Sequence, residues 1–236
     1  VYYDPSKVTT VSELKTKITN GLLTYGSSTD INKFGGRFKY SKILNVIDNI
    51  DDAITSNITR VIVRRNLKAL TNQFAQYELC YGNRFHINPE GKNIKSTGFT
   101  IQGQTDMVYF TDIPNKNSDG TLDGSGKGVL AVVKGDTELS QNQLVVASAG
   151  IVDYNHGEVI ISTINITSTQ RTNNIIEIQA FPESNDIIGL KDLYLSFAVG
   201  DSSINMVKDT ITSGEQISGV GYKVTSSYAN GVLVRG

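Results

Sequence analysis

The chain has 236 residues, with 22 lysines and arginines against 23 aspartates and glutamates, and contains one cysteine and two histidines. A formal net charge of -1 argues against a nucleic-acid-binding protein, which normally carries a clear basic excess. No apolar run is long enough to cross a membrane, a single cysteine excludes an internal disulfide framework, and two histidines argue against structural zinc. Because the first residue is Val1 rather than Met, we expect the chain to be a piece of a longer protein.

The first predicted element is a helix that begins after Thr10. Thr10 and Glu13 have the spacing of a capping box, in which both side chains satisfy backbone N–H groups at the start of a helix. Apolar residues then follow at intervals of three and four and form one stripe: Val11, Leu14, Ile18, Leu22 and Tyr25. The helix should end by Gly26.

A compact split β-α-β region is expected to follow this leading helix. A short strand over residues 37–40 runs into Ser41, a suitable N-cap for a second helix. A strand over residues 58–64 and a run over 73–81 then read as antiparallel neighbours. The first helix should pack nearby.

Beyond residue 83 short β-type runs alternate with polar, glycine-containing turns. The clearest alternation of apolar and polar residues spans 193–199, which is typical of a half-buried strand. Residues 154–157 suit a tight hairpin turn with Gly157 in the left-handed region. The predicted strands are 98–102, 107–111, 128–134, 143–149, 158–166, 175–181, 193–199, 204–211, 221–226 and 232–235.

These patterns predict an α+β fold. We expect an α+β domain over residues 1–82 and a mainly antiparallel β domain over 83–236, either a sandwich or barrel-like. The polar, glycine-rich stretch 115–128 should be a long exposed loop of the second domain.

That loop contains a partial match to a calcium-binding loop. Oxygen-bearing side chains stand at its first, third, fifth and ninth positions, but Asn115 replaces the first Asp and Gly126 replaces the bidentate Glu. A solvated turn explains the same residues, and we expect no metal site. The Gly-rich run 124–128 also lacks the spacing of a phosphate-binding loop.

No group of residues forms a catalytic pattern. Cys80 ends a predicted strand and should be a buried, inert thiol, while His86 and His156 have no partner at ligand spacing. Asp51 and Asp52 are adjacent at a helix end and point in different directions. We therefore expect no enzyme, no catalytic residue and no cofactor.

A basic cluster comprises Arg60, Arg64, Arg65 and Lys68. A phosphate or nucleic-acid surface would use such residues, and a salt-bridged face against a partner or against the acidic residues 48, 51 and 52 would use them equally. We favour the salt-bridged face.

The C-terminal residues offer a candidate self-association surface. They supply more large apolar area than a terminal hairpin can bury alone, and such area usually marks a partner surface. The residues concerned are Tyr222, Val224, Tyr228, Val232 and Val234. The alternative is that they complete the core of their own domain.

Three segments carry a resemblance to a known family. Residues 34–50 read FGGRFKYSKILNVIDNI, residues 58–65 read ITRVIVRR, and residues 150–159 read GIVDYNHGEV. Together they resemble the C-terminal part of the baseplate wedge proteins of T-even-type contractile-tailed phages, a family related to baseplate J-like proteins. The resemblance covers residues 30–65 and 150–236 most closely.

The resemblance implies that the protein is a structural component of the virion tail baseplate, which is assembled in the host cytoplasm. Family members pair as homodimers, and in this chain the pairing could occur with or without exchanged elements. They contact other wedge proteins and join wedges into a ring around the tail hub. That ring rearranges when the sheath contracts. It implies a late virion protein. From the balanced charge and the lack of a long apolar run, we expect no nucleic-acid or membrane partner. Two alternatives remain, a carbohydrate-binding β module at a tail tip and a virion-associated wall hydrolase.

Overall fold

A computed structural model of the chain describes residues 1–135, 143–191, 193–210, 228–229 and 232–233. The described elements, in chain order, are β1 (Tyr2–Tyr3), η1 (Pro5–Lys7), α1 (Val11–Gly26), β2 (Arg37–Phe38), α2 (Tyr40–Asp48), β3 (Ile54–Ser56), β4 (Val63–Lys68), β5 (Phe74–Cys80), β6 (Lys95–Ser96), β7 (Phe99–Ile101), β8 (Tyr109–Pro114), β9 (Lys127–Lys134), β10 (Gln143–Asp153), β11 (Glu158–Thr169), η2 (Thr172–Asn174), β12 (Ile175–Ala180), β13 (Ile187–Ile188), η3 (Val199–Asp201), β14 (Val207–Lys208), β15 (Tyr228–Ala229) and β16 (Val232–Leu233).

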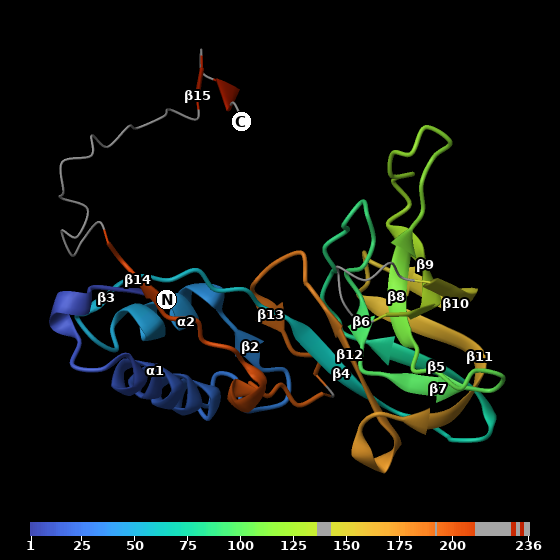
Figure 1. Cartoon of the computed structure of the whole chain (residues 1–236), viewed down its shortest axis with the longest axis horizontal. Helices are drawn as coiled ribbons and strands as arrows, with labels where there is room; N and C mark the ends of the chain where they lie inside the picture. Colours follow the sequence, from blue (N-terminus) through green and yellow to red (C-terminus); the bar gives the residue numbers. More distant parts are fainter. Residues whose placement is uncertain (136–142, 192, 211–227, 230–231, 234–236) are drawn as a thin grey trace.

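The fold is α+β, as predicted, with a leading helix and a β-rich part whose strands pair mostly antiparallel. Among the described residues, buried side chains form two hydrophobic clusters, and the helical and β-rich parts that carry them lie side by side in Figure 1. The helical cluster contains the buried faces of α1 and α2 together with side chains between residues 187 and 206. The β cluster takes its side chains from residues 67–180. The division into domains at residue 82 stays a prediction.

Helix α1 begins where the capping pattern predicts. The Thr10 hydroxyl accepts a hydrogen bond of 3.3 Å from the Glu13 backbone N–H, which satisfies one of the free donors of the first turn. Four members of the predicted apolar stripe, Leu14, Ile18, Leu22 and Tyr25, are buried in the helical cluster, whereas the first member, Val11, is exposed. The prediction of this helix is confirmed.

Helix α2 begins two residues earlier than predicted and has a different cap. Lys39 is its N-cap and makes no side-chain capping bond. Instead the backbone N–H of Tyr40 donates to Oδ1 of Asp186 at 2.7 Å. The prediction of Ser41 as N-cap is wrong because the acceptor comes from a residue 146 positions away, which no local pattern reveals.

The strands predicted at 58–64 and 73–81 exist in part but do not pair with each other. The first is shifted to β4, which pairs with β12, and the second is β5, which pairs with β11. The compact β-α-β pairing predicted for this region is therefore wrong. Between β4 and β5, Nη1 of Arg65 donates to the Cys80 carbonyl at 2.9 Å.

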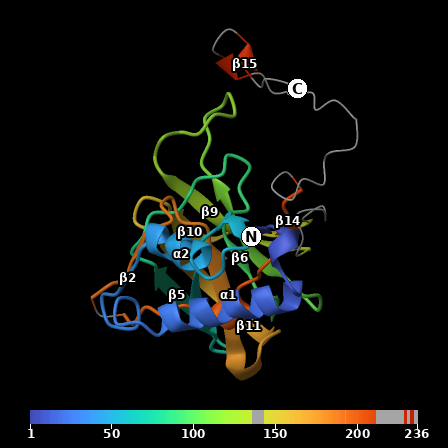
Figure 2. The same ribbon diagram turned by 90° about the vertical axis from the view of Figure 1, so that its left-hand side faces the viewer.

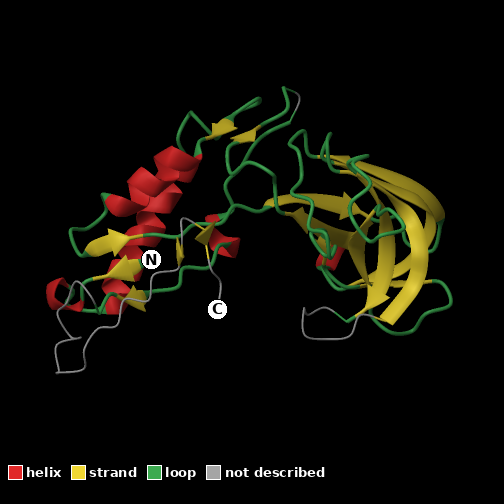
Figure 3. Cartoon of the chain, turned by 90° about the horizontal axis from the view of Figure 1, so that it is seen from above, coloured by secondary structure: helices red, strands yellow, loops and turns green. Residues whose placement is uncertain are grey.

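The main sheet curls strongly on itself, as Figure 3 shows from above. Its nine strands follow the order β4-β12-β6-β8-β9-β10-β11-β5, with β7 paired to β11. The β10–β11 hairpin turns at residues 154–157, and Gly157 has φ 67°. A Cβ at Gly157 would lie 1.9 Å from the Asn83 carbonyl oxygen, so both the backbone angle and the space require glycine. The predicted hairpin is confirmed.

The segment 193–199 was expected to be a strand, and this expectation is wrong. Its alternation is real, since Leu195, Phe197 and Val199 turn toward the helical cluster while the residues between them are exposed. However, this described segment joins its neighbour through an isolated bridge between Phe34 and Tyr194 and ends in η3. Side-chain alternation reports burial on one side, and it does not require a ladder of backbone hydrogen bonds.

The segment 204–211 forms a shorter strand than predicted. Strand β14 pairs in parallel with β1: the Val207 N–H donates to the Val1 carbonyl at 2.8 Å, and the Asp209 N–H donates to the Tyr3 carbonyl at 2.8 Å. The predicted strand 221–226 lies outside the described residues. The strand predicted at 232–235 is described at β16.

Candidate interaction surface

The C-terminal surface predicted from sequence cannot be placed as a whole. Tyr222, Val224 and Val234 lie outside the described residues. Tyr228 and Val232 belong to the paired strands β15 and β16, and their side chains are outside the description. This surface stays a prediction.

The predicted basic cluster is divided between different contacts. Arg64 forms ion pairs with Asp201 at 2.8 Å and with Glu177 at 3.6 Å, whereas Arg65 binds the Cys80 carbonyl. The expected salt-bridged face is therefore present at Arg64, and its acidic partners come from β12 and η3 rather than from residues 48, 51 and 52. Arg60 is exposed.

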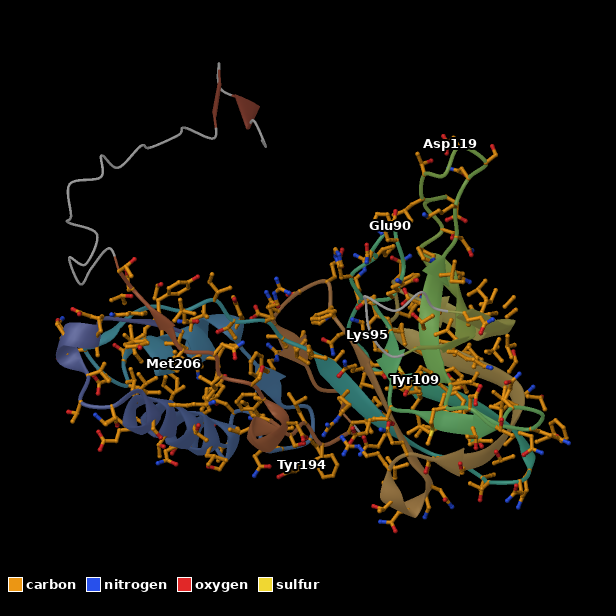
Figure 4. The ribbon with its side chains drawn as sticks, viewed as in Figure 1. Glu90, Lys95, Tyr109, Asp119, Tyr194 and Met206 are labelled. Carbon is orange, nitrogen blue, oxygen red and sulfur yellow. The ribbon has the colours of Figure 1, made fainter. Side chains whose placement is uncertain are left out.

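The loop between β8 and β9 uses its carboxylates within its own turns. Oδ1 of Asp119 accepts from the Thr121 N–H at 2.9 Å, and Oδ1 of Asp123 accepts from the Ser125 N–H at 2.9 Å. Hydrogen bonds from the Thr121 and Ser125 side chains hold the pKa of each carboxyl below its usual value. Figure 4 shows Asp119 at the end of this loop, away from the strands. The part of the chain that the structure describes contains no group of three or more His, Cys, Asp or Glu side chains able to hold a metal.

The cysteine and the exposed histidine also make local contacts. Sγ of Cys80, which is half-buried rather than buried, lies 3.7 Å from Oε1 of Glu158. Nδ1 of His156 lies 3.1 Å from Oδ2 of Asp153 within the hairpin turn. Among the described helices, none has the length and apolar content needed to span a bilayer.

An exposed aromatic pair marks a surface that sequence patterns missed. The rings of Phe34 and Tyr194 meet edge to face with centroids 5.4 Å apart, although 65% and 52% of the two residues are exposed. The Tyr194 hydroxyl donates to the Asn32 carbonyl at 2.9 Å. The Gly35 N–H donates to the Leu190 carbonyl at 3.1 Å, so the two segments are tied together beside the rings. Large aromatic side chains held in place but left exposed are typical of protein-protein contacts.

A basic hollow adjoins this aromatic pair. It is lined by Asp30, Lys33, Gly35, Arg37, Lys39 and Lys42. Lys42 pairs with Asp30, which lowers the pKa of the aspartate and raises that of the lysine through their hydrogen bond and charge. Four cations against one carboxylate give the hollow a positive potential, which suits an anionic partner group. Its residues precede α2 or lie in the first turn of that helix.

A buried polar network in the β cluster was also missed. The Asp112 side chain is 1% exposed and accepts from the Ile94 N–H at 2.6 Å and from the Tyr154 hydroxyl at 2.7 Å. Burial raises the pKa of Asp112, and burial together with the nearby carboxylate raises the pKa of Tyr154. Asn93 precedes Ile94 in the sequence, and its Oδ1 accepts from the Phe181 N–H at 2.7 Å. The network is closed to solvent and ties four segments together, so its role is structural.

Comparison with known proteins bears on the helical part of the chain. No curated protein shows a significant match to the chain. Residues 1–66 match the family model described as baseplate structural protein gp6, C-terminal domain III. The matched residues contain α1, α2, the basic hollow and Phe34. This similarity supports a structural protein of a phage baseplate, located in the virion tail.

Proposed function

We propose that the chain is a structural subunit of a phage baseplate wedge. It associates with itself and with other wedge proteins, links neighbouring wedges into a ring around the tail hub, and moves with that ring when the sheath contracts. This proposal includes kinship with the T-even-type wedge proteins and the baseplate J-like family. It also includes a homodimer, indirect contact with the hub, late expression and assembly in the host cytoplasm.

The match of residues 1–66 to a baseplate structural domain is the observation that carries the proposal. The surface described above supports it, because the exposed aromatic pair and the basic hollow both draw on the matched segment. A subunit held between several neighbours needs such exposed anchors beside charged groups, since the anchors supply buried area and the charges select the partner. The family is structural, which favours a role without catalysis.

The location is tested by gold labelling of a tagged chain in phage particles that carry its gene. Label should appear at the baseplate end of the tail, both in intact particles and in isolated baseplates. Label on the capsid or along the sheath, or particles without label, would contradict the proposal.

The surface is tested by comparing two exposed phenylalanines. Phe34→Ser should reduce incorporation of the chain into baseplates, because it removes half of the aromatic pair. Phe74→Ser is the matched control, since Phe74 is 69% exposed and lies outside the matched residues on β5. Equal incorporation of the two variants would show that the aromatic pair is not a contact.

A further inference from the structure

The loop before β2 is held in one conformation by its own backbone. The Arg37 N–H donates to the Asp30 carbonyl at 3.0 Å and closes the loop at its base. A Cβ at Gly36 would collide with the Ile31 carbonyl oxygen, so this tight turn requires glycine. A loop that is already ordered loses little conformational entropy when a partner binds to it, which favours its use as a contact.

A second segment of the chain fixes the same loop from outside. The Gly189 N–H donates to the Gly36 carbonyl at 2.7 Å, and Ile188 of β13 pairs with Arg37 of β2. Figure 2 shows this contact at one edge of the view, where the blue loop before β2 lies beside an orange segment. Directly opposed residues of an antiparallel pair share a face, so the exposed Ile188 lies beside Arg37, which lines the basic hollow.

Basic residues outnumber the acidic ones around these two segments. The cationic residues are Lys33, Arg37, Lys39, Lys42 and Lys191. The last of them is placed by its Cα, which lies 3.8 Å from the position that a Cβ would take on Gly35. Asp30 also lines the hollow, and Asp186 lies at the start of α2, where it accepts from the Tyr40 N–H. Five cations against these two carboxylates leave an excess of three positive charges, in a chain whose formal net charge is -1.

Intramolecular contacts leave most of these cations without an ionic partner. Lys42 pairs with Asp30, and the hydrogen bond and charge of Lys42 are the main reason that the pKa of Asp30 is lowered. The charges of Lys33 and Lys39 lower this pKa further, so these lysines lie close to the same carboxylate and form one group. Lys33, Arg37 and Lys39 are exposed, and in the part of the chain that the structure describes they make no ion pair. A partner that brings carboxylates would relieve the repulsion within this group.

Exposed aromatic rings lie beside the basic group. Phe34 precedes Gly35, which lines the hollow, and the ring of Phe34 meets that of Tyr194. Figure 4 shows Tyr194 at the lower edge of the molecule. The rings offer a contact for an apolar side chain, which a phosphate or another small anion does not supply. The carboxylate of Asp30 within the hollow also repels the closely spaced phosphates of a nucleic acid, so the surface favours a protein partner with separate acidic and apolar side chains.

We propose that this surface binds an acidic segment of a different baseplate protein. At least two carboxylates of the segment lie against the cations, and a large apolar side chain lies against the aromatic pair. We define the acidic-segment site by its exposed residues Lys33, Phe34, Arg37, Lys39 and Tyr194. The inference rests on the association with other wedge proteins in the proposed function, and it adds the chemistry by which one such partner is recognised.

Photo-crosslinking in phage particles that carry the gene tests the chemistry of the partner. Phe34 is replaced by the photo-reactive residue p-benzoylphenylalanine, which keeps an aromatic ring at the site. The linked peptides are then mapped by mass spectrometry in isolated, nuclease-treated baseplates. The expected peptide belongs to a different baseplate protein and carries two or more Asp or Glu residues beside the link. The same replacement at Phe74, which is exposed on β5, is the control and should not link to that peptide.

The mapped segment, made as a fluorescent peptide, is then titrated with the purified chain. Lys33→Glu combined with Arg37→Glu should weaken binding by about tenfold or more, because two attractive contacts become repulsive. Lys15→Glu combined with Lys116→Glu makes the same change of charge at exposed positions on α1 and on the loop between β8 and β9, and it should leave binding unchanged. Both double variants should keep the wild-type circular-dichroism spectrum and melting midpoint. Binding to the wild type should weaken as the salt concentration rises.

The outcomes distinguish the acidic-segment site from the proposed function. A link from Phe34 to a second copy of the chain, to a segment without carboxylates or to no protein at all would overturn the site, while the chain would remain a baseplate subunit. Equal binding of the peptide by the two double variants would also overturn it. A single-stranded oligonucleotide that binds more tightly than the peptide would assign the surface to nucleic acid instead. Absence of the chain from isolated baseplates would overturn the proposed function, and the inference with it.

Discussion

Removal of the Tyr154 hydroxyl should destabilise the chain far more than its size suggests. In Tyr154→Phe the Asp112 carboxylate loses the donor at 2.7 Å and has no access to water, because both residues are about 1% exposed. Hydrogen bonds to a charged group contribute about 1.5–3 kcal/mol, so we expect a loss near 2 kcal/mol. For a chain of this length that corresponds to a fall of about 4–8 °C in the melting midpoint.

The assay compares thermal and urea unfolding of Tyr154→Phe with those of Tyr194→Phe. The second variant removes the same atom from a half-exposed ring, where water can replace the bond to the Asn32 carbonyl, so we expect a change of at most about 0.5 kcal/mol. Loss of the donor should also raise the pKa of Asp112 further, because the hydroxyl favours the ionised carboxylate. Equal effects of the two substitutions would refute the claim that burial makes this bond costly to lose.

Three further predictions concern caps and pH. Thr10→Ala should cost about 1 kcal/mol in unfolding free energy by removing the first cap of α1, and an unchanged urea midpoint would contradict this. Asp186→Ala should cost a similar amount, because the Tyr40 N–H loses its acceptor, and hydrogen exchange at that amide should accelerate. Burial raises the pKa of Asp112, so the folded chain keeps this proton to a higher pH than the unfolded chain. The stabilisation that follows from this raised pKa is greatest below about pH 4 and falls as the pH rises through the folded-state pKa of Asp112. In urea titrations over that range, the free energy of unfolding of the wild type should therefore decrease relative to that of Asp112→Asn.

Local sequence patterns were sufficient to predict the features that depend on interactions between residues close together in the chain. The cap at Thr10 and the turn at Gly157 depend on residues a few positions apart, and both were predicted correctly. The N-cap of α2 and the partners of β4 and β5 depend on residues about 80 to 150 positions away, and these predictions failed. Alternation in 193–199 correctly indicated which side chains turn inward, but it carried no information about backbone pairing.

The candidate surface was harder to predict than the fold. Phe34 and Tyr194 are 160 positions apart, and each alone reads as an ordinary apolar residue of a core. Asp112 resembles any polar residue in a strand, and its burial follows from the curvature of the sheet around it.

The parallel pairing of β1 with β14 has a mechanical consequence. Because the two strands run in the same direction, pulling residue 1 and residue 209 apart along the strands loads their hydrogen bonds together, in shear. The residues of the β cluster lie between these two strands in the chain. While β1 and β14 stay paired, the pulling force passes directly between them and does not act on the β cluster. The β-rich part is therefore shielded from tension, and a sudden displacement of attached neighbours would strain the small β14-β1-β3 sheet first.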